Sequence, residues 1–505
     1  MVSIFDQGPP PPCPAPFNMA AHVLARGQAT PDKPALQVLS ETGAQTWSHG
    51  EISAAVQGTG TGLLQAGLAP GDIVVLRLGN TVDFPIAYLG AIAAGIVPVP
   101  TSSQLTEAEV AAILADLSPA AVLRDPNVTG APGHREIGLP ELQAMRALPP
   151  CDFDMGPPDR LGYIVYTSGT SGRPRPVAHA HRAIWARQMM FDGWYGLRVD
   201  DRLLHAGAFN WTYTLGTGLM DPWTIGATAL IPEPGTDPAR LPALLAAHGA
   251  TLLAAAPGVF RKMLKSGEKL DLPQLRHGLA AGEKLSPALK SAWGEATGTG
   301  IFEAFGMSEC STFISGAPTR PAEDGALGFP QVGRRVAILG EDGPVPYGEP
   351  GTIAVHRDDP GLMLAYLNAP EETAARFRGD WFLTGDRGSM APSGQVSYQG
   401  RDDDMMNAGG YRVSPIEVET ALTGVPGVEQ IGVTDIEIKP DTFIIVAFYT
   451  GPEPVADAVL AARAQDRLAR YKQPRAYVHL PEMPTNPNGK LSRRALKPLF
   501  ESRPQ

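Results

Sequence analysis

The chain has 505 residues, which is too long for one ordinary hydrophobic core and favours two or more domains. A hydrophobic content of 43% favours packed globular structure over disorder. Lys and Arg number 41 against 52 Asp and Glu, a net charge of −11, so the chain is a poor general binder of nucleic acid, although local basic clusters could still hold a nucleotide.

The cysteines and the apolar segments indicate the cellular compartment in which the protein is expected. Cys13, Cys151 and Cys310 lie far apart with no Cys-x-x-Cys pair, which argues against a zinc knuckle or a disulfide framework and is typical of a reducing cytosol. Residues 1–17 lack the basic and apolar regions of a secretory signal. Segment 86–97, the most membrane-like, is shorter than the roughly 20 residues of a spanning helix. We therefore expect a cytoplasmic protein without a membrane span.

Helical stretches alternate with short apolar runs through the first quarter of the chain. The spacing predicts helices at 18–24, 51–64, 82–94 and 107–117, and strands at 73–78, 96–99 and 120–123. Such alternation predicts a mostly parallel α/β sheet.

The stretch Tyr163-Ile-Val-Tyr-Thr-Ser-Gly-Thr-Ser-Gly-Arg-Pro-Arg175 begins as a strand and ends in hydroxyl residues and glycines. Glycine lets a ligand approach the backbone, and consecutive turn amides can hold an anion, so the stretch suits the phosphates of a nucleotide. The spacing is not that of a Walker loop, because no lysine follows Gly172. Taken alone, these residues fit an ordinary Ser/Gly turn equally well.

A helix is expected to begin near His181 and to carry Ile184, Trp185 and Met189. His179 and His181 are two residues apart, and this spacing does not bring two ligands onto one helical face. They are therefore interpreted as loop and helix-entry residues rather than metal ligands.

The second half of the chain shows the same alternation and then changes character. A helix is expected at 241–248 and a strand at 251–256, whereas 328–367 is rich in Gly, Pro and short apolar runs and predicts a β-rich region. Ser414-Pro-Ile-Glu417 is a capping-box pattern with proline at the first helical position, so a helix should begin there. Further on, strands are expected at 443–449 and 476–480, with a helix at 460–469.

Five stretches together resemble the motifs of the adenylate-forming superfamily, which contains acyl-CoA synthetases, adenylation domains and firefly luciferase. They stand in the family's order: Tyr163 to Arg175, Phe302-Glu-Ala-Phe-Gly-Met-Ser-Glu309, Trp381-Phe-Leu-Thr-Gly-Asp386, Gly400-Arg-Asp-Asp-Asp-Met-Met-Asn-Ala-Gly-Gly-Tyr-Arg412 and Pro487-Asn-Gly-Lys-Leu-Ser-Arg-Arg494. Each is weak singly, but five in register over most of the chain are highly specific. Within the superfamily the chain resembles benzoate- and aryl-acid–CoA ligases.

The resemblance implies an α/β fold in two domains. A large N-terminal domain, residues 1–402, would contain parallel α/β sheets and a β-rich subdomain. A small mobile α+β lid, residues 403–505, would carry the catalytic lysine and turn about a hinge at Asp403.

The resemblance also implies a site for ATP and Mg²⁺. Phe305 would stack on adenine, and Asp386 would accept the ribose hydroxyls, because a carboxylate can accept two hydrogen bonds. Glu309 and Thr170 would hold the metal, and with Lys490 they form the predicted catalytic set. The full predicted ATP/AMP set is Thr167, Ser168, Gly169, Thr170, Ser171, Gly172, Arg173, Gly282, Glu283, Lys284, Glu303, Ala304, Phe305, Gly306, Met307, Ser308, Asp386, Arg401 and Lys490.

An acyl pocket and a CoA face follow from the same resemblance. Aromatic residues within 206–216 are usually core, but in the family this segment lines the acyl pocket, and Tyr213 falls where benzoate and coumarate ligases contact the aromatic ring. The predicted pocket comprises Phe209, Asn210, Trp211, Tyr213, Ala281, Gly282, Gly306 and Met307, and the predicted CoA face comprises Gly409, Gly410, Tyr411 and Arg412.

The implied activity is an AMP-forming acid–thiol ligase that makes an acyl-adenylate and then an acyl-CoA thioester, from an aromatic or other small ring acid. One alternative is a stand-alone adenylation enzyme that loads a carrier protein. Another is a non-catalytic binder, which the presence of Glu309, Asp386, Arg401 and Lys490 disfavours. A monomer or homodimer is expected.

Two positions depart from the family pattern. The loop usually ends Lys-Pro-Lys-Gly, and here it reads Arg173-Pro-Arg-Pro176. Arginine keeps the charge, but its planar fork is not equivalent to an ammonium, and Pro176 removes a backbone amide. Asn407 stands where many members have lysine.

Overall fold

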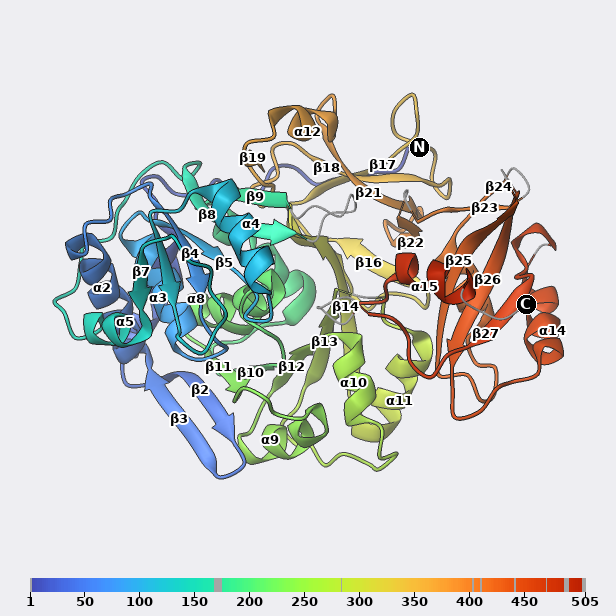
Figure 1. The fold of residues 1–505 in the computed structure, drawn as a ribbon, viewed down its shortest axis with the longest axis horizontal. Helices are drawn as coiled ribbons and strands as arrows, with labels where there is room; N and C mark the ends of the chain where they lie inside the picture. The colour runs from blue at the N-terminus through green and yellow to red at the C-terminus, as the bar shows by residue number, and fades with distance from the viewer. Residues whose placement is uncertain are drawn as a thin grey trace. The chain divides into compact units, whose positions relative to one another are not determined.

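A computed structural model describes residues 2–167, 175–282, 284–401, 404–408, 411–439, 442–468, 470–485 and 490–501 (Figure 1). The chain divides into two compact units. The larger unit comprises Phe5–Val336 and Val355–Phe382, and the smaller comprises Met1–Ile4, Ala337–Ala354 and Leu383–Gln505. The domain boundary expected after residue 402 stays a prediction.

The main sheet of the larger unit is parallel at its centre. Its strand order is β16-β15-β14-β13-β12-β10-β11-β2-β3; the run from β14 to β2 is parallel, and the strands at either end are antiparallel. The strands are β2 Pro34–Ser40, β3 Gly43–Ser48, β10 Arg202–His205, β11 Thr228–Pro232, β12 Leu252–Ala255, β13 His277–Ala281, β14 Gly300–Met307, β15 Ser311–Ser315 and β16 Ala326–Pro330.

Both faces of this sheet are covered, which explains its continuous apolar strands. Alternate residues such as Leu204 and Leu253 pack with Phe260 and Trp293 from the helices on one face. These helices are α9 Leu241–Ala247, α10 Pro257–Met263 and α11 Pro287–Thr297. The opposite face packs against aromatic residues from the irregular helical segments after the phosphate loop and after β10. Those segments are α6 Ala183–Ala186, the π-helical turn Phe191–Tyr195, α7 Thr212–Leu215, the π-helical turn Gly216–Met220 and α8 Asp221–Ile225.

A second, fully parallel sheet has the order β5-β4-β6-β7. Its strands are β4 Ile73–Arg77, β5 Val97–Pro100, β6 Ala121–Arg124 and β7 Glu136–Gly138. The helices around it are α1 Met19–Leu24, α2 His49–Gln65, α3 Asp83–Ala93, α4 Glu107–Leu117 and α5 Leu139–Met145. The helices and strands expected in this region are confirmed within a few residues.

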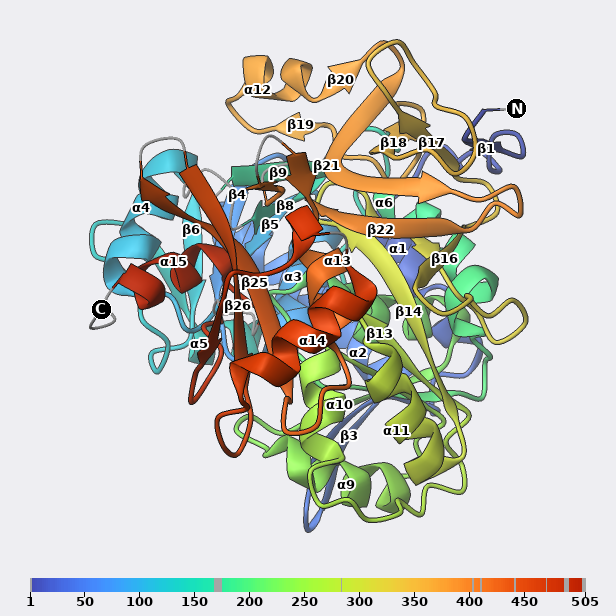
Figure 2. The same cartoon turned by 90° about the vertical axis from the view of Figure 1, so that its right-hand side faces the viewer.

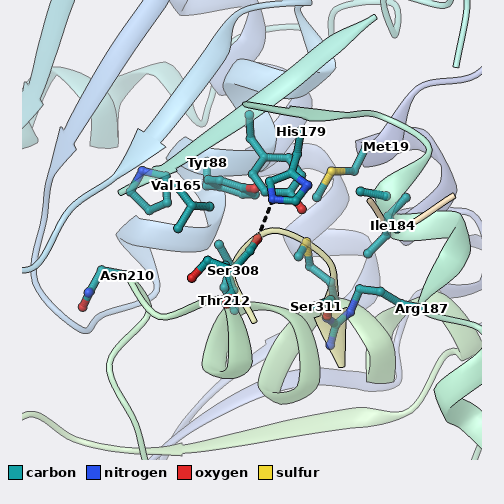
Figure 3. A pocket seen from close by; sticks show the side chains of 16 residues that line it. Met19, Tyr88, Val165, His179, Ile184, Arg187, Asn210, Thr212, Ser308 and Ser311 are labelled. Carbon is teal, nitrogen blue, oxygen red and sulfur yellow. Dashed lines mark hydrogen bonds between the residues drawn. The ribbon is translucent and has the colours of Figure 1, made fainter. Parts of the chain in front are cut away.

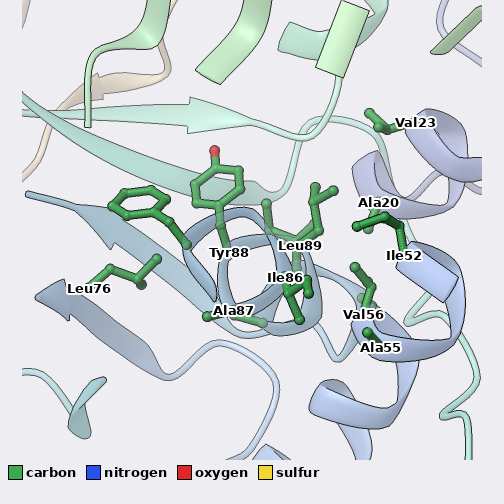
Figure 4. Close-up of a cluster of buried hydrophobic side chains, with 14 of the residues drawn as sticks. Ala20, Val23, Ile52, Ala55, Val56, Leu76, Ile86, Ala87, Tyr88 and Leu89 are labelled. Atoms are coloured by element: carbon green, nitrogen blue, oxygen red, sulfur yellow. The ribbon is translucent and has the colours of Figure 1, made fainter. Parts of the chain in front are cut away.

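Helix α3 explains the membrane-like segment of the sequence. All 11 of its residues are buried, and Figure 4 shows it surrounded by apolar side chains such as Leu76 of β4 and Ile52 and Val56 of α2. A helix apolar on every side is expected where neighbours cover every side. No helix among the described residues is both long and apolar enough to cross a membrane.

A small antiparallel sheet has the order β19-β9-β8. Strands β8 Leu161–Thr167 and β9 Arg175–Ala180 form a hairpin in which Thr167 pairs with Arg175, so the predicted phosphate loop connects two paired strands. β19 Ala365–Tyr366 pairs with β9 and is followed by α12 Pro370–Ala375 and β20 Phe377–Arg378.

Two expectations around this hairpin were wrong. His179 lies in strand β9, not in a loop, because the pairing with β8 continues to Ala180. The helix expected from His181 is broken: Arg187 and Gln188 donate to Ile184 and Trp185 three residues back, and these tight turns end α6 after one turn.

The smaller unit ends in the sheet β25-β26-β27, formed by Gln430–Lys439, Thr442–Thr450 and Ala476–His479. Residues of β26 alternate, so that Ile445 and Ala447 pack with α13 Pro415–Leu422 and α14 Asp457–Arg467, whereas Val446 and Phe448 pack with α15 Arg493–Glu501 (Figure 2). Ser414 caps α13 by accepting the Glu417 amide at 3.3 Å, as the motif predicts. The remaining strands of the chain are β1 Ile4–Asp6, β17 Arg335–Leu339, β18 Gly351–His356, β21 Trp381–Met390, β22 Val396–Arg401, β23 Met406–Ala408 and β24 Tyr411–Val413.

Candidate active site

Three loops of the larger unit leave the same edge of the main sheet. Strands β10, β13 and β14 are parallel, so their carboxyl ends lie together. The segment with Asn210 follows β10, Gly282 follows β13, and Ser308 and Glu309 follow β14. Ligands of open α/β sheets bind at such an edge.

The turn that carries Glu309 is held from two sides. The ring Nε2 of His179 lies 2.7 Å from the Ser308 carbonyl oxygen. The Tyr366 hydroxyl donates to Glu309 Oε1 at 2.7 Å, and the Met363 amide donates to the Glu309 carbonyl at 2.7 Å. Glu309 is 8% exposed, so its carboxylate is oriented by Tyr366 of β19 rather than by solvent.

A cavity lies next to this turn (Figure 3). Its walls combine apolar side chains with a few polar ones, which is the usual make-up of a small-molecule site. The lining residues are Met19, Tyr88, Pro100, Tyr163, Val165, His179, Ala183, Ile184, Arg187, Asn210, Thr212, Leu215, Met220, Ser308, Ser311 and Gly361.

The charge at the cavity wall is balanced within the protein. Arg187 donates Nε and Nη2 to the two oxygens of Asp221, at 2.8 and 2.6 Å, and Nη1 to the Ser311 hydroxyl at 2.5 Å. Tyr195 also donates to Asp221, at 2.7 Å. Burial opposes the charge on the guanidinium, but Asp221 outweighs it and raises the pKa of Arg187. The ion pair is therefore fixed, and Gly216 leaves room for it, because a Cβ there would lie 2.3 Å from the Arg187 Cζ.

His179 and Tyr88 both line the cavity, and each has a buried polar atom. A carbonyl oxygen only accepts, so Nε2 of His179 is the protonated nitrogen and Nδ1 keeps a lone pair. Burial lowers the pKa of His179 to about 4, which keeps the ring neutral. Among the described residues, neither Nδ1 of His179 nor the hydroxyl of Tyr88 has a hydrogen-bond partner.

The residues predicted for the acyl pocket separate into two groups. Asn210 lines the cavity. Phe209, Tyr213 and Ala281 are buried in core clusters, and the Tyr213 hydroxyl donates to the Leu279 carbonyl at 2.8 Å. Trp211 packs edge-on against Tyr213 with ring centroids 5.0 Å apart.

The predicted glycines and Met307 lie beside the turn. Gly282 has φ +94°, a conformation that favours glycine. Gly306 permits close packing of β14 on β15, because a Cβ would lie 2.2 Å from the Ser311 carbonyl oxygen. Met307 is partly buried and ends β14.

Sequence reasoning missed several lining residues, notably Tyr88, His179 and Arg187. The signal for Arg187 was available, because a charged residue within an apolar segment needs a buried partner. Tyr88 lies in an apolar helix about 75 residues before the phosphate loop, and no local pattern links the two.

The adenine-site residues predicted in the larger unit lie on and beside β14. Phe305 is half-buried, with its ring edge-on to Phe313 at 5.4 Å. Glu303 accepts the Leu285 amide at 3.0 Å, and burial raises its pKa to about 7, against the opposing effects of that amide, Lys284 and Lys290. Ala304 is buried between Glu303 and Phe305, and Lys284 directly precedes Leu285.

Arg175, one of the departures from the family pattern, is engaged within the protein. It forms an ion pair with Glu372 at 2.9 Å, and its guanidinium lies over the ring of Tyr366, 5.4 Å from the centroid. Arg175 therefore stabilises the tyrosine that orients Glu309.

Within the smaller unit, two predicted nucleotide residues are cross-strand neighbours. Asp386 of β21 pairs with Arg401 of β22. Asp386 is 6% exposed and accepts from the Tyr398 hydroxyl at 3.0 Å. Lys490 is partly buried and precedes Leu491, which forms an isolated bridge with Thr485.

The other predicted residues lie outside the described ones or are described only in their backbone. Outside lie Ser168, Gly169, Thr170, Ser171, Gly172, Arg173, Glu283, Asp403, Gly409 and Gly410, whereas Tyr411 and Arg412 belong to β24.

The residues present fit a magnesium ion held mainly by a nucleotide. Mg²⁺ prefers oxygen ligands and is often bound by one or two carboxylates together with phosphates and water. Glu309, whose carboxylate is oriented by Tyr366, would supply one such ligand. No cluster of three or more His, Cys, Asp or Glu side chains suited to a metal occurs among the described residues.

The fold, an α/β unit and a small α+β unit, matches solved structures of adenylate-forming acyl-CoA ligases, and this match indicates the class of the protein. Residues 23–367 match the model of the AMP-binding enzymes, and residues 417–490 match that of the AMP-binding enzyme C-terminal domain. The chain belongs to the AMP-binding enzyme family, and the acid–thiol ligase class expected from its motifs is confirmed.

The similar proteins include ligases of aromatic acids. The chain is 28% identical to the 3-hydroxybenzoate–CoA ligase of Aromatoleum sp. (strain CIB), over 95% of each chain. It is 30% identical to the 4-hydroxybenzoate–CoA/benzoate–CoA ligase of Rhodopseudomonas palustris, over 90% of this chain and 89% of that one. The structure of the anthranilate–CoA ligase AuaEII with anthranoyl-AMP superposes with a TM-score of 0.87 at 25% identity, covering 97% of this chain and 99% of that chain.

Proposed function

We propose that this protein joins a small aromatic carboxylic acid to CoA through an acyl-adenylate, with ATP as the activating substrate and Mg²⁺ as its counter-ion. The observation that carries the proposal is the cavity beside the Ser308–Glu309 turn, whose mainly apolar wall suits a flat ring. Relatives that ligate benzoate and hydroxybenzoates to CoA support the same substrate class.

In the first half-reaction, a carboxylate oxygen of the acid attacks the α-phosphorus of ATP, and the bond to the β-phosphate breaks to release pyrophosphate. Both reactants are anionic, so neutralising charge is the main task of the site. Lys490 is assigned to bridge the carboxylate and the α-phosphate. Thr170 and the loop amides would contact the terminal phosphates, and Glu309 would hold Mg²⁺, which supplies positive charge there.

The remaining proposed contacts are to the adenine, the ribose and the phosphate of the nucleotide. Phe305 offers a face for adenine, and Asp386 offers carboxylate oxygens to the ribose hydroxyls. Arg401, the cross-strand neighbour of Asp386, would lie against the ribose and phosphate.

In the second half-reaction, the sulfur of CoA attacks the acyl carbon, the bond to the phosphate oxygen breaks, and AMP leaves. The thiol proton passes to solvent. Gly409, Gly410, Tyr411 and Arg412 are assigned to the pantetheine arm, and a rotation of the C-terminal domain about Asp403 would exchange them for Lys490.

The test is AMP formation across a panel of acids, with and without CoA. We expect ATP–pyrophosphate exchange with an aromatic acid alone, and stoichiometric AMP and thioester once CoA is added. Highest kcat/KM for acetate or palmitate would contradict the aromatic assignment. Transfer to a holo-carrier protein but not to CoA would support the carrier-loading alternative, and no exchange with any acid would refute adenylation.

A further inference from the structure

We infer that His179 and Tyr88 select an acid whose ring carries a neutral hydrogen-bonding substituent, a hydroxyl or an amino group. The inference rests on the proposed function and adds a specificity-determining pair to it. Both residues line the cavity (Figure 3). The ring of each packs against Tyr163, at centroid distances of 4.9 Å for His179 and 6.2 Å for Tyr88.

His179 requires a ligand that donates a hydrogen bond to its ring nitrogen Nδ1. Its Nε2 is committed as a donor to the Ser308 carbonyl, so Nδ1 can only accept. His179 is 2% exposed, so solvent does not replace the missing partner. A buried acceptor left unpaired is costly, and a ligand that donates to it gains affinity over one that does not.

Tyr88 supplies the second hydrogen-bonding group for the ring substituent. Its side chain is fully buried, and Figure 4 shows the hydroxyl directed away from the apolar side chains packed around α3. A phenolic hydroxyl both donates and accepts. A ligand hydroxyl could therefore donate to Nδ1 of His179 and accept from Tyr88, and a ligand amino group could donate to both.

The charged groups that line the cavity disfavour an acid substrate that carries a second carboxylate. Among the described lining residues, Arg187 carries the one permanent positive charge, and both oxygens of Asp221 already neutralise it. A second carboxylate would also face the lone pair of Nδ1. Dicarboxylic acids should therefore be poor substrates.

The direct test compares benzoate with its hydroxy, amino and methoxy derivatives and with benzene dicarboxylates. We expect at least one hydroxy or amino isomer to exceed benzoate in kcat/KM by about tenfold or more. The methoxy counterpart, which has no proton to donate, should lose that advantage. Equal kcat/KM for benzoate and every hydroxy and amino isomer would overturn the inference while leaving the ligase function intact.

The variant Tyr88→Phe tests the same pair from the protein side. It should lower the preference for the hydroxy acid over benzoate by about tenfold, because the partner of the hydroxyl is lost. The melting temperature without ligand should not fall, because the hydroxyl makes no hydrogen bond within the described protein. A fall in melting temperature with unchanged preference would mean that the hydroxyl is structural and would overturn the inference.

Tyr477→Phe is the matched control, since Tyr477 also has a buried hydroxyl without a partner among the described residues but belongs to strand β27 of the smaller unit. It should leave the preference unchanged. If Tyr88→Phe instead raises KM for CoA and leaves the acid preference intact, the cavity receives the thiol arm and the inference fails. Binding of the acids, measured by calorimetry without ATP, separates this result from a general loss of activity.

Discussion

Glu303 makes the stability of the protein depend on pH in a way that one substitution should remove. Its carboxyl accepts the Leu285 amide, and burial raises its pKa from 4.5 to about 7. Below pH 4.5 the carboxyl is protonated in both the folded and the unfolded chain and has no effect. Between pH 4.5 and 7 the unfolded chain releases a proton that the folded chain keeps, so stability falls as pH rises.

The size of the effect follows from the two pKa values. At about 1.36 kcal/mol for each tenfold change in proton affinity, the full penalty above pH 7 is about 3 kcal/mol. The side chain is partly accessible to solvent, which makes this an upper value. We expect Glu303→Gln to gain about 2 kcal/mol over the wild type between pH 5 and pH 8, because glutamine still accepts from Leu285 but does not ionise.

Urea unfolding followed by tryptophan fluorescence at pH 5, 6, 7 and 8 measures this difference, with Trp194 and Trp293 as buried reporters in the same unit. Glu295→Gln, on the exposed face of α11, controls for the loss of one negative charge. Parallel stability curves for the wild type and Glu303→Gln across this range would refute the reasoning.

Three further substitutions test the assigned roles. Tyr366→Phe removes the hydroxyl that orients Glu309 and should lower kcat/KM for MgATP by roughly tenfold, with a higher Mg²⁺ requirement in a steady-state titration. An unchanged Mg²⁺ dependence would contradict the role of Glu309 as a metal ligand. Lys490→Ala should abolish ATP–pyrophosphate exchange but spare thioester formation from a supplied acyl-adenylate, and equal loss of both would contradict a role in one half-reaction. Asp403→Pro fixes φ at the expected hinge and should retain exchange while releasing little acyl-CoA; normal thioester formation would locate the hinge elsewhere.

Local sequence patterns predicted many of the helices and strands. Helix α4 runs over Glu107–Leu117 as predicted, because a capping box and regular apolar spacing mark its start and length. The segment after His181 was mispredicted, because its apolar spacing is helical while Arg187 forms a buried ion pair with Asp221, 34 residues away. Tertiary contacts of that range override local propensity.

Long-range contacts that local sequence patterns do not reveal also shape the candidate active site. The motif around Glu309 identified a turn, and the structure adds what no motif contains: His179 and Tyr366, which hold that turn from separate strands. For Tyr213, contact with the ring of the acid stays a prediction. The structure adds that its hydroxyl donates to the Leu279 carbonyl within the core, a contact that the motif does not contain.

The position of His179 has a consequence for attempts to change the substrate range. One face of this residue borders the cavity, and its Nε2 supports the backbone that carries Glu309. Redesign at His179 would therefore disturb acid recognition and nucleotide chemistry together, and the two effects could not be selected independently. The apolar lining residues Met19 and Met220 have no such second task in the turn, and methionine tolerates exchange for other apolar side chains of similar volume. Libraries that vary these two positions should reshape the pocket while activation of the acid is retained.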